Sequence, residues 1–137
     1  MELGNLTEED HKLLALWAAD CAERVLPYFQ AHYPNDSRPQ DAIKAARAWV
    51  KGELKMTDAR KAAFATHAAA REAVDKSAVA AARAAGHAAA TAHVVTHAPH
   101  AANYAIKALT DIGDERTIAN EKRWQTQHLP KHLQALA

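Results

Sequence analysis

The segment from Ala78 to His100, AVAAARAAGHAAATAHVVTHAPH, constrains the fold more than any other part of the sequence. Alanine, which dominates it, has the highest intrinsic helix propensity of all residues. Small or imidazole side chains recur at steps of three and four residues, which places them on one helix face: Val79, Ala82, Gly86, Ala90, His93 and His97. Because such a face lets neighbouring backbones approach closely, the segment predicts a tightly packed helix, and any functional site is expected beside it.

The composition as a whole also favours helices. Hydrophobic residues make up 49% of the 137 residues and charged residues 24%, which is typical of a globular chain. Valine, isoleucine and aromatic residues are sparse and do not alternate with polar residues, so strands have little to form from. We therefore predict an all-α fold: residues 1–137 form a single-domain, alanine-rich helical bundle of about six helices.

Capping residues and helix breakers divide the chain into helices. Pro27 either kinks or ends the first helix. Ser37 is expected to cap the second, and Asp75 and Ser77 are candidates for the turn before the fourth. The predicted helices, by residue number, are 7–30, 38–53, 58–74, 78–97, 103–112, one that begins at 114, and a short one after 129. Four aromatic residues have core-like positions in this pattern: Trp17, Phe29, Trp49 and Phe64.

Charge and cysteine content exclude several classes of protein. The formal net charge is +1 and no block of like charge occurs, so neither nucleic acid nor a membrane surface is an expected partner. No stretch is long and apolar enough to span a bilayer or serve as a secretory signal. Cys21 alone cannot form an internal disulfide and is expected to be a packed, neutral thiol. We expect a cytoplasmic protein.

The histidines of the alanine-rich segment are candidate metal ligands. His93 and His97 are spaced i, i+4 and His100 follows three residues later, so all three share a face if the helix continues past Pro99. Three imidazoles suit zinc or a similar divalent metal, with a fourth ligand from His67, Asp20 or Glu23. No acidic residue lies between Ala78 and Thr110. The alternative, which we favour, is that each histidine fills a gap between helices and hydrogen-bonds a neighbour.

Asp20 shares an apolar stripe with Leu13, Leu16 and Trp17, which predicts a partly buried carboxylate. Such a group needs a cationic partner. Candidate partners are Arg47, Arg71 and Arg83, and an ion pair that fixes helix register is favoured over a ligand-binding carboxylate. Enzymatic activity has little support, because the sequence has no glycine-rich phosphate loop and its serines, Ser37 and Ser77, have the pattern of helix caps.

Four segments carry a resemblance to a known family: LALWAADCAERVLPYF (14–29), RPQDAIKAARAWVKGE (38–53), ARKAAFATHAAAR (59–71) and ARAAGHAAATAHVVTHAPHAANYAIKA (82–108). Together they resemble the bacterial immunity proteins of the Imm-5-like family, from about residue 11 to 132. The resemblance implies an all-helical cytoplasmic protein that neutralises a cognate toxin by binding it. It transfers no catalytic residues, and these matching positions mark where a shared site would lie: Asp20, Arg47, His67, His87, His93, His97 and His100.

Two hypotheses therefore remain open. In the first, a surface of the protein binds a toxin. In the second, the histidine-lined helix face holds a metal or small ligand, using His93, His97 and His100 for the metal, with Asp20 on the opposite side. An alanine-rich surface is also compatible with a homodimer.

Overall fold

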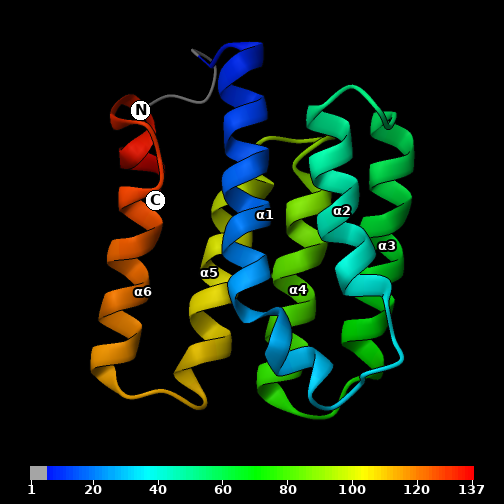
Figure 1. Ribbon diagram of the computed structural model, residues 1–137, viewed down its shortest axis with the longest axis vertical. Helices are drawn as coiled ribbons and strands as arrows, with labels where there is room; N and C mark the ends of the chain where they lie inside the picture. The colour runs from blue at the N-terminus through cyan, green and yellow to red at the C-terminus, as the bar shows by residue number, and fades with distance from the viewer. Residues whose placement is uncertain (1–5) are drawn as a thin grey trace.

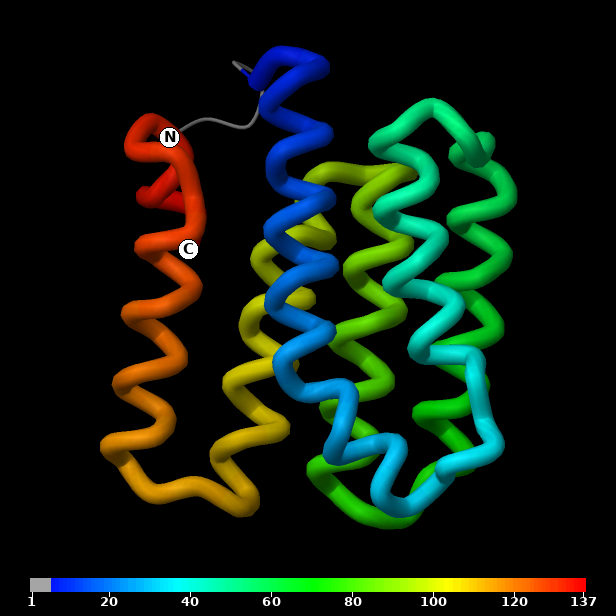
Figure 2. Tube along the Cα trace, in the orientation of Figure 1, coloured from blue at the N-terminus to red at the C-terminus, as the bar shows by residue number. Residues whose placement is uncertain are grey.

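The computed structural model of the protein describes residues 6–137, and its regular elements are all helices, which confirms the predicted all-α fold. Six are α-helices and the last is a 3₁₀ helix. In chain order they are α1 (Glu8–Gln30), α2 (Arg38–Val50), α3 (Met56–Glu72), α4 (Lys76–Ala90), α5 (His97–Thr110), α6 (Glu115–Gln127) and η2 (Lys131–Leu136). Figure 2 shows the path of the chain through this order.

The helices form two layers with one helix at the side. Helices α1 and α2 lie side by side over α3, α4 and α5, and α6 flanks the bundle next to α5 (Figure 1). Helix α4 is the middle of the second layer, because it contacts α3 and α5 beside it and both α1 and α2 above it. Within residues 6–137, every helix is too short or too polar to span a bilayer.

The buried side of α4 has no side chain larger than serine. Its ten buried residues are Ser77, Ala78, Ala80, Ala81, Ala82, Ala84, Ala85, Gly86, Ala88 and Ala89. Small side chains let four neighbouring helices approach the α4 backbone closely, so the core is held by many short contacts between alanines. The prediction of a tightly packed helix from this segment is confirmed.

Larger core residues come mainly from α1. Phe29, Leu14 and Val25 are fully buried, and Leu133 of η2 joins them. The indole Nε1–H of Trp17 donates to the Gln125 carbonyl at 2.8 Å, which ties α6 to the bundle. Pro27 lies inside α1, which continues to Gln30.

Several predicted details of the core and caps are wrong. Phe64 is 58% exposed, and Trp49 is only partly buried, against a small separate cluster of alanines. Helix α2 ends at Val50 before Gly52, whose φ is +75°. Ser37 makes no capping bond, because its hydroxyl donates to Asp41. The buried Ser77 donates to the Ala108 carbonyl, and Asp75 alone caps α4.

The alanine-rich segment does not form one helix through His97, as predicted, because α4 ends at Ala90 and α5 begins at His97. The Thr91 carbonyl accepts a hydrogen bond at 2.5 Å from His11 Nε2, so it needs no partner in a continuing helix. Pro99 also prevents continuation, because its ring would clash with the carbonyl four residues earlier, whereas the first turn of α5 tolerates it. Proline here marks the start of α5, which sequence analysis placed at residue 103.

Enlarging a buried alanine of α4 should destabilise the bundle. Ala85 is fully buried, so Ala85→Leu is expected to lower the free energy of unfolding by about 1–3 kcal/mol through overpacking. Ala65→Leu on the exposed side of α3 is the control and should change it by less than about 0.5 kcal/mol. Urea denaturation measures both, and equal effects would contradict the packing described for α4.

Candidate functional site

The polar side chains of α4 lie on one stripe that faces outward. All α4 residues that are not buried belong to it: Lys76, Val79, Arg83, His87 and Ala90. Since α1 and α2 cover the opposite side, the outer surfaces of α3, α4 and α5 form a continuous face around this stripe. We call this surface the α3–α5 face, and its side chains used below are Arg60, Phe64, His67, Arg83, His87, His97, His100, Tyr104 and Lys107.

Four histidines meet at the centre of the α3–α5 face, and we call them the histidine cluster: His67, His87, His97 and His100. His87 lies in the middle. Its ring centroid is 5.1 Å from those of His67 and His97 and 5.4 Å from that of His100. The ring of Tyr104 stacks on His87 at 5.2 Å. Of the predicted site residues, the structure therefore brings together those of α3, α4 and α5.

Hydrogen bonds restrict the protonation of three of these rings. Arg83 Nη1 donates to Nδ1 of His67 at 2.9 Å, and because a guanidinium only donates, the proton of His67 must be on Nε2. The Nδ1 atoms of His87 and His97 are also 2.9 Å apart, so one of them donates and the other accepts. Each bond requires at least one neutral imidazole.

The surroundings of the cluster favour the neutral state. Burial, with help from Arg83, lowers the pKa of His67 from 6.5 to about 4. Burial and the neighbouring histidines lower the pKa of His87 to about 3. The pKa of His97 is also lowered, mainly by burial. At neutral pH these rings are uncharged donors and acceptors, held close to cationic arginine.

Gly86 makes room for one ring of the cluster. A Cβ atom at this position would lie 2.6 Å from Cε1 of His67 and 2.8 Å from its Nε2. Only glycine lets the His67 imidazole lie against the α4 backbone, which explains the glycine within an otherwise alanine-rich helix.

A cavity of about 190 Å³ opens beside the cluster, where α3 meets the end of α4 and the start of α5. It is lined by Arg60, Ala63, Phe64, His67, Ala90, His93 and His97. The guanidinium of Arg60 lies over the exposed ring of Phe64, 5.2 Å from its centroid. Phe64, which the sequence pattern assigns to the core, therefore belongs to the surface of this cavity.

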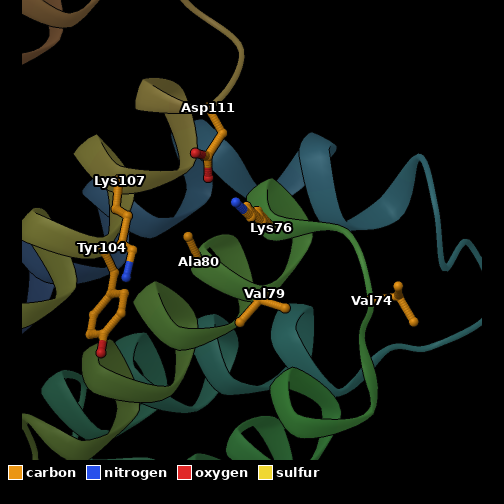
Figure 3. Close-up of a pocket in the computed structure, with 7 residues that line it drawn as sticks. All are labelled: Val74, Lys76, Val79, Ala80, Tyr104, Lys107 and Asp111. Carbon is orange, nitrogen blue, oxygen red and sulfur yellow. The ribbon is translucent and has the colours of Figure 1, made fainter.

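A second, larger cavity lies at the other end of α4 (Figure 3), with a volume of about 390 Å³. Its lining residues are Val74, Lys76, Val79, Ala80, Tyr104, Lys107 and Asp111. Lys107 extends along the ring of Tyr104, with Nζ 5.8 Å from the ring centroid. Both cavities thus present cationic side chains next to aromatic or aliphatic ones.

The proposed metal ligands do not share a helix face. His93 is exposed in the loop after α4, while His97 and His100 are in the first turn of α5. The i, i+4 spacing of His93 and His97 therefore does not place them on one helix face. Among residues 6–137, no group of three or more histidine, cysteine, aspartate or glutamate side chains is arranged to hold a metal ion. Binding of zinc stays a prediction.

Asp20 and Arg47 form a separate site. Arg47 Nη2 donates to Asp20 at 2.8 Å and its Nη1 donates to Glu23 at 2.7 Å, which confirms the predicted ion pair between α1 and α2. The Asp20 side chain is 49% exposed, which confirms the predicted partly buried carboxylate. Because the contact joins α1 to α2, neither Asp20 nor Glu23 faces the histidine cluster, whereas His67, the third candidate for a fourth metal ligand, lies in it.

Sequence reasoning did not identify Arg60, Tyr104 and Lys107 as part of a site. One signal was present: His97, His100, Tyr104 and Lys107 follow the three- and four-residue steps of a helix face, but only once α5 is recognised to begin at His97. The pairing of Arg83 with His67 joins two helices and had no local signal.

One family of known proteins matches this chain. The model of that family, described as Imm-5 like putative immunity protein, matches residues 4–132. The chain belongs to this family. No curated protein sequence and no solved structure matches it significantly. The match to the Imm-5 like family extends over nearly the whole helical bundle, including the α3–α5 face.

The low pKa values of the cluster predict how stability depends on pH. Since the folded-state pKa values of His67 and His87 lie below 6.5, the unfolded chain binds more protons when the pH falls. Their contribution to the free energy of unfolding is fully present above pH 6.5 and is lost progressively as the pH falls to about 3, the folded-state pKa of His87. The free energy of unfolding, measured in urea, should therefore decrease over this range.

His87→Gln should flatten this pH dependence, because glutamine does not titrate. His128→Gln removes an exposed histidine outside the cluster, directly after the end of α6, and should retain the wild-type slope. An identical slope in wild type and His87→Gln would show that the cluster is not held in its neutral state.

Proposed function

We propose that the protein binds and neutralises a cognate bacterial toxin, in the cytoplasm of the cell that makes both. The observation that carries this proposal is the family match over residues 4–132, since the family is described as immunity proteins. A protein that protects by binding needs a stable scaffold and an exposed surface with unsatisfied polar and apolar groups. The alanine-packed bundle and the α3–α5 face fit those two needs.

The common nucleophilic side chains of the described residues have structural roles, which also fits a binding protein. Cys21 is fully buried, and burial raises the pKa of its thiol. Ser77 is buried against the Ala108 carbonyl, and Ser37 donates to Asp41 at the start of α2. An activated nucleophile is usually hydrogen-bonded to a histidine that serves as its base. Within residues 6–137, none of these three hydroxyl or thiol groups makes such a hydrogen bond.

A metal- or ligand-binding role for the histidine cluster is the second candidate. One observation favours it: the Nδ1 atoms of His87 and His97 converge to 2.9 Å, and a divalent ion such as zinc binds pairs of imidazole nitrogens after displacing a proton. Structural and catalytic zinc sites use three or four protein ligands, so this pair alone is a weaker basis than the family match. The predicted homodimer is likewise a proposal, to be tested by light scattering.

The immunity proposal predicts that the protein protects cells from a specific toxin. Each polypeptide encoded beside its gene is produced in a bacterial host with and without the protein. One of them should stop growth alone, lose this effect when the protein is co-produced, and elute with it as a complex in size-exclusion chromatography.

The proposal would be contradicted if a polypeptide encoded beside the gene stops growth and the protein neither neutralises nor binds it.

The metal hypothesis is tested on the same preparations by equilibrium dialysis against zinc. Stoichiometric binding lost in His87→Gln/His97→Gln, with a folded protein by circular dichroism, would favour the second candidate instead.

A further inference from the structure

The α3–α5 face combines many cationic and imidazole groups with almost no carboxylates. Residues 76–110, which include all of α4 and α5, contain no aspartate or glutamate. In α3 the carboxylates are at the two ends, where Asp58 lies 4.0 Å from Lys61 and Glu72 pairs with Arg38 of α2. Within residues 6–137, Arg60, Arg83 and Lys107 form no ion pair with a carboxylate. This surface is complementary to negative charge.

The cavity of about 190 Å³ places one cation of this face, Arg60, beside several imidazole rings. Arg60, His67 and His93 line it together with His97, which is the first residue of α5. The N-terminus of a helix carries a partial positive charge from the aligned peptide dipoles, so α5 adds to the attraction for an anion. The cavity has the volume for a carboxylate side chain, and its own lining contains none.

Apolar side chains beside this cavity favour a protein over a free anion. Phe64 is 58% exposed and Val94, next to His93, is 38% exposed, although large hydrophobic residues are usually buried. Exposed aromatic and aliphatic groups around a charged pocket are typical of the centre of a protein interface. A small inorganic anion would leave both in water.

The second cavity, at the far end of α4, extends the same face. The cavities are separated by most of the 15-residue helix α4, which is about 21 Å long, and an extended segment of about six residues spans that distance. Lys76 and Lys107 offer cationic groups there, and Asp111 is the one carboxylate among the lining residues of this cavity (Figure 3).

We propose that the α3–α5 face binds an extended acidic segment of the toxin, with one carboxylate in the cavity beside Arg60 and His93 and an apolar residue against Phe64. This inference rests on the proposed function, since it names the surface and the chemistry by which the toxin is recognised. The histidine cluster lies under the middle of the segment, where His67, His87 and His97 offer neutral hydrogen-bonding rings.

An acidic peptide tests the surface without the toxin. The probe is acetyl-Glu-Glu-Leu-Glu-Glu-Leu-Glu-amide, titrated into ¹⁵N-labelled protein at low salt, with the peptide in which glutamine replaces every glutamate as the control. Amide shifts are expected in residues 60–67, 93–100 and 104–107 with the acidic peptide alone. Shifts confined to α2 or α6 would overturn the proposal.

Matched variants show whether the cavity carries the binding. Arg60→Gln/His93→Gln removes two exposed side chains of the cavity and should weaken binding of the peptide about tenfold. Arg116→Gln/His128→Gln removes the same two residue types from the exposed surface at α6 and the residue that follows it, and should leave binding unchanged. Equal affinity of both variants, or inorganic phosphate that binds as tightly as the peptide, would overturn the proposal.

The same variants separate this inference from the proposed function. In the growth assay, the Arg60→Gln/His93→Gln protein should lose protection against the toxin, while the α6 variant retains it. Protection by both variants would leave the immunity function standing and overturn the docking surface. If wild type gives no protection, the immunity function fails, and the peptide titration alone decides whether the face takes acidic segments.

Discussion

The structure depends on the close packing of four helices around α4. This packing is possible because ten of its fifteen residues are buried alanine, serine or glycine. Such a helix contributes little apolar area per residue, so stability comes from many short contacts and from the larger side chains that α1 adds, such as Phe29 and Leu14. The constraint also decides where polar groups go, because every larger side chain of α4 must point outward.

The histidine cluster follows from this constraint. Helices α1 and α2 cover one side of α4, so the stripe that holds Arg83 and His87 lies on the opposite side. His67 of α3 and His97 of α5 contact this stripe from its two edges. Gly86 lets His67 approach the backbone. Partly buried imidazoles with lowered pKa values reduce stability as the pH falls below 6.5.

Local sequence signals predicted much of the fold. The all-helical class, the cap at Asp75, the start of a helix at residue 114 and the need of Asp20 for an arginine partner could be derived from residue types and their spacing, whereas the choice of Arg47 among three candidate arginines could not. The break after Ala90 was missed, although residues 91–96, TAHVVT, are mostly weak helix formers and were a local signal for it. A contact between His11 and the Thr91 carbonyl, eighty residues apart, also helps to end the helix and had no local signal. Because this break was missed, the metal prediction placed His93, His97 and His100 on one helix. The cluster in the structure instead draws its histidines from α3, α4 and α5.

The misplacement of Phe64 has a similar cause. Its spacing with Ala63 and His67 fits a buried face, but the buried side of α3 is formed by Ala59, Ala63, Thr66, Ala69 and Ala70, since only small residues fit against α4. A large aromatic residue is thereby left at the surface, next to Arg60 and the cavity.

The structure of the complex with the neutralised toxin tests this account most directly. We predict an acidic toxin segment along α4, with a carboxylate beside Arg60 and an apolar residue on Phe64; a toxin bound to α2 or α6, with the α3–α5 face open to solvent, would contradict it.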